Sequence, residues 1–473
     1  MFIISSIFFL LLLIDKSFGV CNLPPDFWCD HPKIAIECTG SLQYCDGYRA
    51  ARAYQPINLR LAFEAACPDS QQFITLRLYP QILSKPHLLN MVNFKAIPWG
   101  LAKREGVSQV RCHHGERECI GNRLLSCAFL YYSNNPMKSG KLFNCFMSSM
   151  AYKPPPKRAI TECLQHLQTP PEAQASILHC AQSSQADTLQ RHDEVETRAI
   201  LSTPRFVPFI SINGRSHIHM QAYQLFLGSK IPIWNRTLST IAPTNSRPSR
   251  CQLPPDFWCS DPSFTNECYN SAGCSAYEKM AYGKPIKFKI IYDSSLKNSV
   301  DYILRYIKPH FSKDGRVTVE IEPTPISRCA ISDPACSDHA IQECVTNKII
   351  QPTERNTIFY CLLDAPPGGM KTAWTQKCHF LVKSFDPRLK DSVLNCANTN
   401  EWQTLASTRS QTHRIKLQPH SPQSFPWLII NDHSLQSAQA YQKILHQTLC
   451  LWYRGPYHNR DACSRCEYEA THC

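Results

Sequence analysis

A nine-residue phrase that occurs twice is the feature that most constrains how this chain can fold. Cys21-Asn-Leu-Pro-Pro-Asp-Phe-Trp-Cys29 recurs as Cys251-Gln-Leu-Pro-Pro-Asp-Phe-Trp-Cys259, and self-similarity of this kind indicates a duplicated unit. Later cysteines continue in step, with Cys38, Cys45, Cys145, Cys163 and Cys180 matched by Cys268, Cys274, Cys361, Cys378 and Cys396. The sequence of 473 residues therefore predicts two copies of one domain.

The repeat sets the expected domain boundaries. Residues 20–228 form the first predicted domain and residues 251–455 the second. A stretch rich in Pro, Ser, Thr and Asn at 229–250 reads as an exposed linker between them. A Cys-rich tail at 456–473 follows the second copy.

The amino terminus and the cysteine content indicate the compartment. Residues 1–19 resemble a cleaved signal peptide, because an apolar run too short to cross a bilayer is followed by the small residues Ser17 and Gly19. The 25 cysteines are then expected to pair as disulfides. We expect a secreted or lysosomal protein without a transmembrane anchor, and a glycan on Asn235 in the sequon Asn-Arg-Thr.

The charge balance is basic but does not indicate a nucleic-acid partner. The chain carries 50 Lys+Arg against 37 Asp+Glu, a formal net charge of +13, which can favour nucleic acid or anionic membrane. The basic residues are scattered, however, and no stacking platform or groove-reading motif accompanies them. No nucleic-acid binding is expected.

One cysteine of the first copy stands between a predicted strand and a predicted helix. Alternating apolar residues predict a strand over 57–63, and a helix-like stretch occupies 71–83. At this junction the first N–H groups of the helix would stabilise a Cys67 thiolate and lower its pKa. Ser70 can donate its hydroxyl to the sulfur, whereas Asp69 opposes a second negative charge. Without Cys67 the first copy holds an even number of cysteines, which favours a free thiol over the alternative of another structural disulfide.

A denser motif lies downstream in the same copy. Its fixed positions are Cys112, His114, Gly115, Glu118, Cys119, Asn122 and Cys127. The motif resembles the signature C-Q-H-G-x2-E-C-x2-N-x4-C of the gamma-interferon-inducible lysosomal thiol reductase (GILT) family, with His113 in place of the Gln. The strand-Cys67-helix unit, the phrase Ile97-Pro-Trp-Gly100 and the segment Val207-Pro208-Phe209 resemble the family in the same order, so that the likeness covers residues 56–228.

The resemblance implies a fold and an activity. The implied fold is α/β, with two tandem thioredoxin-like domains that each carry a helical, disulfide-rich insertion. The implied activity is reduction of protein disulfides by Cys67 as the nucleophile. The fold analogy predicts a cis peptide before Pro208, where Val207 and Pro208 leave backbone groups free to pair with substrate.

One departure from the family pattern changes the expected mechanism. The family has C-x-x-C where this chain has Cys67-Pro-Asp-Ser70. Only the first attack is then intrinsic, and a small-molecule or protein thiol must release the product. No cofactor is expected. The alternative is a non-enzymatic binding or holding protein on the same disulfide-stapled scaffold.

Two other cysteine patterns have a structural interpretation. Cys112-His-His-x4-Cys119 could supply zinc ligands, but its spacing fits no usual zinc module and disulfides are the default here, so no metal is expected. His113 and His114 are then expected at the surface or near the mouth of the site. Cys463 and Cys466 in the tail have C-x-x-C spacing without a preceding apolar strand, and are expected to form structural bridges.

The second copy lacks the reactive group. Aligned on its predicted strand, Leu296 stands opposite Cys67 and Ser299 opposite Ser70. The segment from Cys336 to Asn347 reads as its counterpart of the signature, with Pro352 where the last cysteine should be. An inactive second domain is therefore predicted.

Overall fold

The structure is a computed structural model that describes residues 21–52, 56–105, 109–200, 206–216, 218–235, 255–259, 265–266, 271–326, 334–382 and 387–455. The predicted signal peptide and the tail with Cys463 and Cys466 lie outside these residues. Asn235 is the last residue of a helix, but its side chain and the rest of the sequon also lie outside the description. Among the described residues no helix is both long and apolar enough to cross a membrane.

A small mixed sheet organises the first half of the chain. Its central strand β1 (Ile57–Phe63) pairs in parallel with β2 (Val92–Pro98) and antiparallel with β5 (Phe209–Ile212). Residues 57, 59 and 61 of β1 are buried because alternate side chains of a strand point to the same face. A separate hairpin, β3 (Lys103–Glu105) and β4 (Gln109–Arg111), follows β2.

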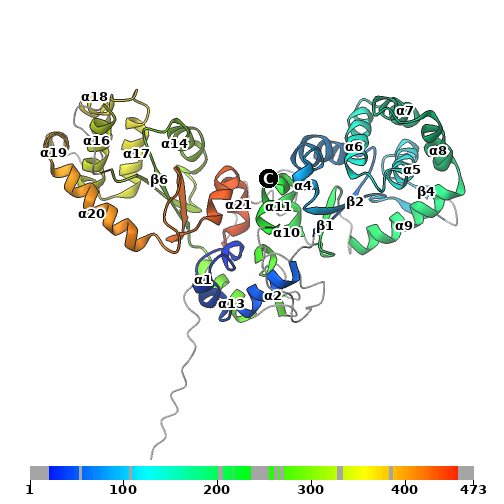
Figure 1. The fold of residues 1–473 in the computed structure, drawn as a ribbon, viewed down its shortest axis with the longest axis horizontal. Coiled ribbons are helices and arrows are strands. Elements are labelled where there is room, and N and C mark those ends of the chain that lie inside the picture. Colours follow the sequence, from blue (N-terminus) through cyan, green and yellow to red (C-terminus); the bar gives the residue numbers. More distant parts are fainter. Residues whose placement is uncertain are drawn as a thin grey trace, which may run out of the picture.

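Helices surround this sheet and fill the long insertion before β5. The chain after β1 continues as α3 (Pro68–Phe73), a π-helical segment η2 (Ile74–Leu83) and α4 (Pro86–Leu89). The insertion contains α5 (Glu116–Tyr131), α6 (Pro136–Ala151), α7 (Pro156–His166), α8 (Pro171–Gln182) and α9 (Ser184–Ile200). Figure 1 shows these helices together at one end of the molecule.

The second half contains a sheet of the same order. Its central strand β6 (Ile286–Tyr292) has β7 (Val317–Pro323) as a parallel neighbour and β8 (Trp427–Ile430) as an antiparallel one, and β9 (His433–Ser434) adds an edge. Its helices are α14 (Lys297–Tyr302), η6 (Ile303–Ile307), α15 (Lys308–Phe311), α16 (Pro334–Lys348), α17 (Pro352–Leu362), α18 (Met370–Gln376), η7 (Cys378–Leu381), α19 (Pro387–Asn398) and α20 (Glu401–Lys416). The described chain is therefore mixed α/β with small sheets and many helices.

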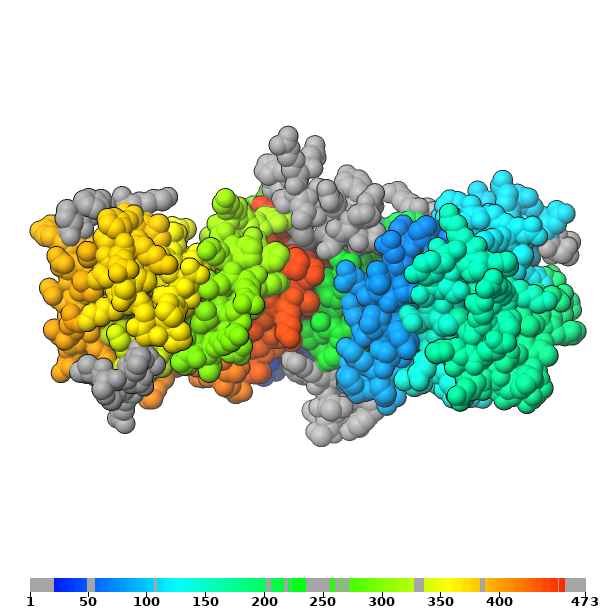
Figure 2. Space-filling model, turned by 90° about the horizontal axis from the view of Figure 1, so that it is seen from above, coloured from blue at the N-terminus to red at the C-terminus, as the bar shows by residue number. Residues whose placement is uncertain are grey.

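Between the two sheets lies a central group of short helices. They are η1 (Pro25–Phe27), α1 (Pro32–Thr39), α2 (Gln43–Arg52), α10 (Ile218–Gln221), η3 (Ala222–Leu225), α11 (Leu227–Asn235), η5 (Pro255–Phe257), α13 (Ser271–Ala281), η8 (Ser437–Ile444) and α21 (Leu445–Trp452). Figure 2 shows the two halves at opposite ends, with the last helices in red beside the end of the first half in green. Helix α11 occupies the first residues assigned to the linker, and Ile231 is fully buried there, so those residues belong to the core.

The repeated phrase crosses from each half to the other. Phe27 packs against Tyr441 and Trp452, with ring centroids 5.0 and 5.4 Å apart. Phe257 packs in the same way against Tyr223 and Trp234 of the first half, at 5.0 and 5.6 Å. These aromatic contacts join the two halves into one buried core, since each phrase fills a space that the other half provides.

A buried ion cluster lies between the two phrases. Lys230 on α11 contacts Asp26 at 2.9 Å and also pairs with Asp256, so that one ammonium group serves two carboxylates. Its Nζ donates to the Tyr441 hydroxyl at 2.6 Å. All three charged side chains are at most 3% exposed, and charges removed from water to this extent must be paired.

Disulfides correct one part of the sequence alignment. Cys127 pairs with Cys180, and Cys344 pairs with Cys396. Since Cys396 is the counterpart of Cys180, Cys344 corresponds to Cys127 rather than to Cys119. The alignment of residues 336–347 with the signature is therefore wrong by one cysteine, and Pro352 does not replace the last cysteine. The remaining described pairs are Cys21–Cys38, Cys29–Cys45, Cys112–Cys119, Cys145–Cys163, Cys259–Cys274 and Cys361–Cys378.

Candidate functional site

Cys67 lies at the junction that the sequence predicts. It is the N-cap residue of α3, directly after the turn that ends β1, and it is the one free cysteine among the described residues. Its Sγ lies 3.8 Å from the carbonyl oxygen of Val207. The peptide bond between Val207 and Pro208 is cis, as predicted. The structure therefore brings together the Cys67 sulfur and the segment expected to meet substrate.

Ser70 supports the sulfur from the first turn of the helix. Its backbone N–H and its hydroxyl act to lower the pKa of Cys67, against the effect of burial, and so favour the thiolate. The Ser70 hydroxyl also accepts a hydrogen bond from the backbone N–H of Glu64, at 3.4 Å. Ser70 is fully buried, so it is part of the wall behind the sulfur rather than a group that faces solvent.

The expected lowering of the Cys67 pKa is wrong. The residue is only 6% exposed, and burial raises the pKa of the thiol. The hydrogen bonds from Ser70 offset this effect in part, while the charge of Glu64 adds to it. The physical reason is that removal from water disfavours the charged form more strongly than the helix start favours it. The sequence indicated the helix but not the depth of burial.

Glu64 is a site residue that sequence reasoning missed. Glu64 precedes Cys67 by three residues, and its side chain is fully buried. Its Oε1 accepts a hydrogen bond from the backbone N–H of Leu101 at 2.7 Å. Burial raises the pKa of Glu64, and the neighbouring Glu118 raises it further. An acidic residue at the buried end of a strand, just before a candidate nucleophile, was the signal that could have identified it.

The signature motif forms a loop beside this carboxylate. The Cys112–Cys119 disulfide closes the loop, and Gly115 with a φ of +80° is the N-cap of α5. Glu118 is fully buried; its Oε1 accepts from the His113 N–H at 3.1 Å, and its Oε2 lies 2.6 Å from His114 Nδ1. Burial raises the pKa of Glu118 to about 7. The disulfide also occupies both thiols, which rules out the zinc set built on these two cysteines.

Both histidines of the loop face the buried Glu64. The Nδ1 atoms of His113 and His114 lie 3.4 and 3.1 Å from Glu64 Oε2. Their side chains are 56% and 31% exposed, which agrees with the expected position at the surface or at the mouth of the site. The motif thus places two imidazoles between solvent and a buried carboxylate close in sequence to the thiol.

Asn122 fixes the turn that precedes the thiol. Its Oδ1 accepts a hydrogen bond from the backbone N–H of Ala65 at 2.9 Å, and the side chain is fully buried. From the opposite direction, Gln71 Nε2 donates to the carbonyl oxygen of Ala65 at 2.9 Å. Gly121 lets α5 approach, because a Cβ there would lie 2.8 Å from the Ala65 side chain. The Asn of the signature therefore positions the reactive turn.

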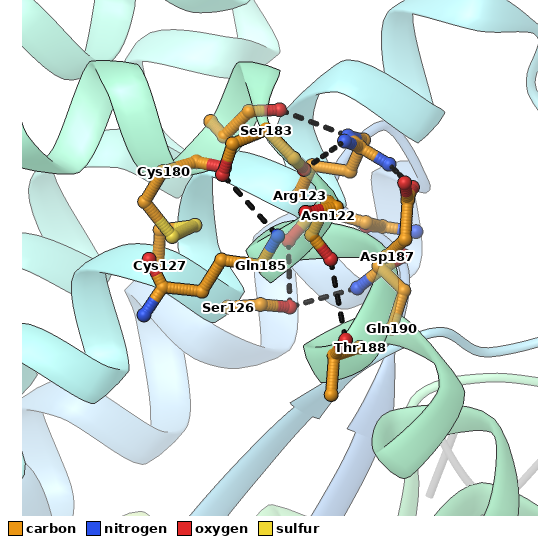
Figure 3. Close-up of a disulfide and its surroundings, with 12 residues drawn as sticks. Asn122, Arg123, Ser126, Cys127, Cys180, Ser183, Gln185, Asp187, Thr188 and Gln190 are labelled. Carbon is orange, nitrogen blue, oxygen red and sulfur yellow. Dashed lines mark hydrogen bonds and ion pairs between the residues drawn. A yellow bond between two sulfur atoms is a disulfide. The ribbon is translucent and has the colours of Figure 1, made fainter.

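Cys127 anchors α5 at a distance from the thiol. Figure 3 shows its disulfide to Cys180 on α8, with Ser126 and Gln190 hydrogen-bonded nearby at 2.7 Å. Arg123 on the same helix pairs with Asp187 and donates to the Ser183 carbonyl oxygen at 3.1 Å. These contacts join α5 to the helices after it, so the last cysteine of the signature contributes support rather than chemistry.

The equivalent junction in the second half has no sulfur. Leu296 is the N-cap residue of α14, as Cys67 is of α3. Ser299 keeps the contact of Ser70, since its hydroxyl accepts from the Asp293 N–H at 3.1 Å. The backbone arrangement is retained, and a leucine stands in place of the cysteine.

Sequence comparison shows similarity to one group of known proteins. The family model described as gamma interferon inducible lysosomal thiol reductase (GILT) matches residues 58–167. The chain is 28% identical over 197 residues to "Gamma-interferon-inducible lysosomal thiol reductase" of Carassius auratus, which covers 41% of this chain and 72% of that protein. It is 28% identical over 199 residues to "GILT-like protein 1" of Drosophila melanogaster, covering 38% and 74%. A third relative, from Anopheles gambiae, is 28% identical over 164 residues, covering 32% and 64%.

Proposed function

Because the chain belongs to the GILT family, we propose that its first half reduces protein disulfides with Cys67 as the single nucleophile. The observation that carries the proposal is the position of the free Cys67 sulfur, 3.8 Å from the Val207 carbonyl oxygen and beside the cis peptide bond to Pro208. A thiol in this setting can be aligned with an extended substrate paired to the backbone beside Pro208. Family membership supports disulfides as the substrate class.

The proposed reaction needs thiols from outside the chain. The Cys67 thiolate attacks one sulfur of the substrate disulfide, a mixed disulfide forms, and the other substrate sulfur leaves as a thiolate that takes up a proton. A small thiol then attacks the Cys67 sulfur and releases the first substrate sulfur. A second small thiol regenerates Cys67, so the two electrons come from two external thiols. The buried Ser70 hydroxyl supports the thiolate but cannot perform the resolving step of a second cysteine.

The second half serves a structural role in this proposal. Leu296 stands where the nucleophile would be. Tyr441 and Trp452 of this half pack against Phe27 of the first half. We infer that both halves have a thioredoxin-like fold. The order of the strands around β1 and β6 supports this inference. The proposed setting is the secretory or lysosomal pathway after removal of residues 1–19, with a glycan on Asn235.

The test is to trap the covalent intermediate. Mature protein is mixed with a denatured disulfide-containing protein, quenched with acid and analysed by non-reducing electrophoresis and mass spectrometry. We expect a persistent mixed disulfide between Cys67 and the substrate protein, which an excess of small thiol cleaves. Ser70→Cys should shorten the lifetime of the adduct, because the new thiol can resolve it.

The matched control is Cys67→Ser, which should form no adduct and show no reductase activity with an external thiol. If wild type and Cys67→Ser proteins are equally inactive while both bind unfolded protein, the non-enzymatic holding function would replace this proposal.

A further inference from the structure

We propose that His113, His114 and Glu64 form a binding site for a divalent transition-metal ion of the Zn²⁺ class. The site is close to Cys67 but does not use its sulfur. The sequence predicts no metal when Cys112 and Cys119 are taken as the ligands. Glu64, which lies behind the loop, is a further ligand that this prediction leaves out.

The spacing of the three donor atoms fits a metal ion. Glu64 Oε2 lies 3.4 Å from Nδ1 of His113 and 3.1 Å from Nδ1 of His114, and the three donor atoms all lie within 4.8 Å of one another. Ligands at about 2.0–2.2 Å from a tetrahedral Zn²⁺ ion are separated from each other by roughly 3.4 Å. The two nitrogens and the oxygen can therefore reach one ion with small adjustments.

The buried oxygen of Glu64 that faces the two histidines is the inner ligand of the proposed site. Glu64 is fully buried, and its Oε2 forms no hydrogen bond of acceptable geometry; its neighbours are the Nδ1 atoms of His113 and His114, at 3.4 and 3.1 Å. Buried carboxylate oxygens are normally paired, and each exception calls for an explanation. The other oxygen is held by the Leu101 N–H at 2.7 Å, so the carboxylate is fixed with its free oxygen toward the histidines. A cation bound there would satisfy this oxygen.

Glu118 holds the two histidines from the protein side and is not itself one of the proposed ligands. Its Oε2 lies 2.6 Å from His114 Nδ1, while its Oε1 accepts the His113 N–H. When His114 Nδ1 binds an ion it cannot keep its bond to Glu118, which does not belong to the group of donor atoms that lie within 4.8 Å of one another. The resulting set of two imidazoles and one carboxylate suits Zn²⁺ and related ions, with the fourth position taken by water.

The loop also provides access and an extra nitrogen. The His113 side chain is 56% exposed, so an ion can enter from solvent while Glu64 forms the inner wall. His113 stands where the family signature has Gln, and this substitution adds the second imidazole. The proposed site is therefore a property of this chain's own loop.

The experiment measures binding of Zn²⁺ to the full mature chain, with its disulfides intact, by calorimetry at neutral pH. We expect one site per chain whose affinity falls at least tenfold in His113→Gln and in Glu64→Gln. The matched control is His87→Gln, another exposed histidine outside the cluster, which should bind as wild type does. Cys67→Ala should also bind normally, so loss of thiol chemistry and loss of metal binding are distinguishable.

Substitution with Co²⁺ gives a second readout. An all-nitrogen-and-oxygen site should show d–d absorption without a thiolate-to-metal charge-transfer band. Equal affinity of wild type and His113→Gln for Zn²⁺, or a charge-transfer band that disappears in Cys67→Ala, would overturn the assigned ligands. Near-UV circular dichroism first checks that the buried substitution Glu64→Gln leaves the protein folded. If Glu64→Gln is unfolded, the exposed His113→Gln decides the question.

Discussion

The backbone of Gly100 lies directly against the carboxylate of Glu64. A Cβ added at Gly100 would lie 2.7 Å from Glu64 Oε1 and 2.9 Å from its Cδ, and the Gly100 φ of +61° is itself costly for other residues. The neighbouring Leu101 N–H holds the same oxygen. The glycine of the Ile97-Pro-Trp-Gly100 phrase therefore leaves room for the buried acid beside the reactive turn.

Gly100→Ala should destabilise the protein more than a positive φ alone explains. We expect a loss of about 2–4 kcal/mol in the free energy of unfolding, from backbone strain and from displacement of Glu64. The control is Gly214→Ala, which has a φ of +78° and nothing within 4 Å of the added Cβ, and should cost about 1 kcal/mol. Urea denaturation with intact disulfides measures both, and equal losses would contradict the packing role of Gly100.

Ser70→Ala should slow the reaction of Cys67. Hydrogen bonds to charged groups contribute about 1.5–3 kcal/mol, so loss of the hydroxyl should raise the Cys67 pKa and lower the alkylation rate at fixed pH about tenfold or more. Ser299→Ala removes the equivalent bond, to the Asp293 N–H, where there is no sulfur. That control should lose similar stability and leave the alkylation rate unchanged. A Ser70→Ala protein alkylated as fast as wild type would show that the hydroxyl does not support the thiolate.

Lys230→Thr should weaken the packing of the two halves. The change leaves Asp26 and Asp256 without their buried partner, which costs about 3–5 kcal/mol. The threonine is the residue that the second half has at the equivalent position, Thr448, which is also buried. Adding Asp26→Asn should recover part of the loss, and the exposed Lys279→Thr is the control. Equal thermal stability of the two lysine variants would refute the role of the cluster.

Stability should fall as pH rises through neutrality, and Asp256 should account for part of the fall. Burial raises the pKa of Asp256 to about 7, and the charge of Asp26 raises it as well. The stabilisation from the neutral acid is present below its unfolded pKa of about 3.9 and is lost as pH rises through the folded value, by at most about 1.4 kcal/mol per pH unit.

Asp256→Asn should therefore reduce the slope of unfolding free energy between about pH 5 and pH 8. The slope should not vanish, because burial also raises the pKa of Asp193 to about 6. Denaturant titrations between about pH 5 and pH 8 measure this slope for the wild type and for Asp256→Asn. An unchanged slope would mean that Asp256 does not titrate in this range.

Local features of the sequence predicted the strand, the helix and the free cysteine at the Cys67 junction. The alternation at Ile57 to Phe63 identified β1, and the even count of the other cysteines identified Cys67 as the free one. These features depend on neighbouring residues or on covalent pairing, which a sequence records directly. The pKa of Cys67 could not be read in this way, because it depends on burial by distant segments such as that of Val207.

The alignment of the second copy also shows what sequence spacing predicts and what only the tertiary structure reveals. Spacing alone matched Cys344 to the wrong cysteine, and only the disulfide to Cys396 gave its true counterpart. Likewise the phrase around Phe27 was recognised as repeated, but nothing in it indicated that it packs on Tyr441 of the other half.

By itself the sequence determined which residues are covalently or locally special: the duplicated phrase, the unpaired Cys67 and the signature loop. Only the tertiary structure decided what surrounds them, namely the buried Glu64 that faces His113 and His114, and the exchange of aromatic side chains between the halves. The reason is physical: charge, burial and packing are set by groups far apart in the chain, whose meeting no local pattern encodes.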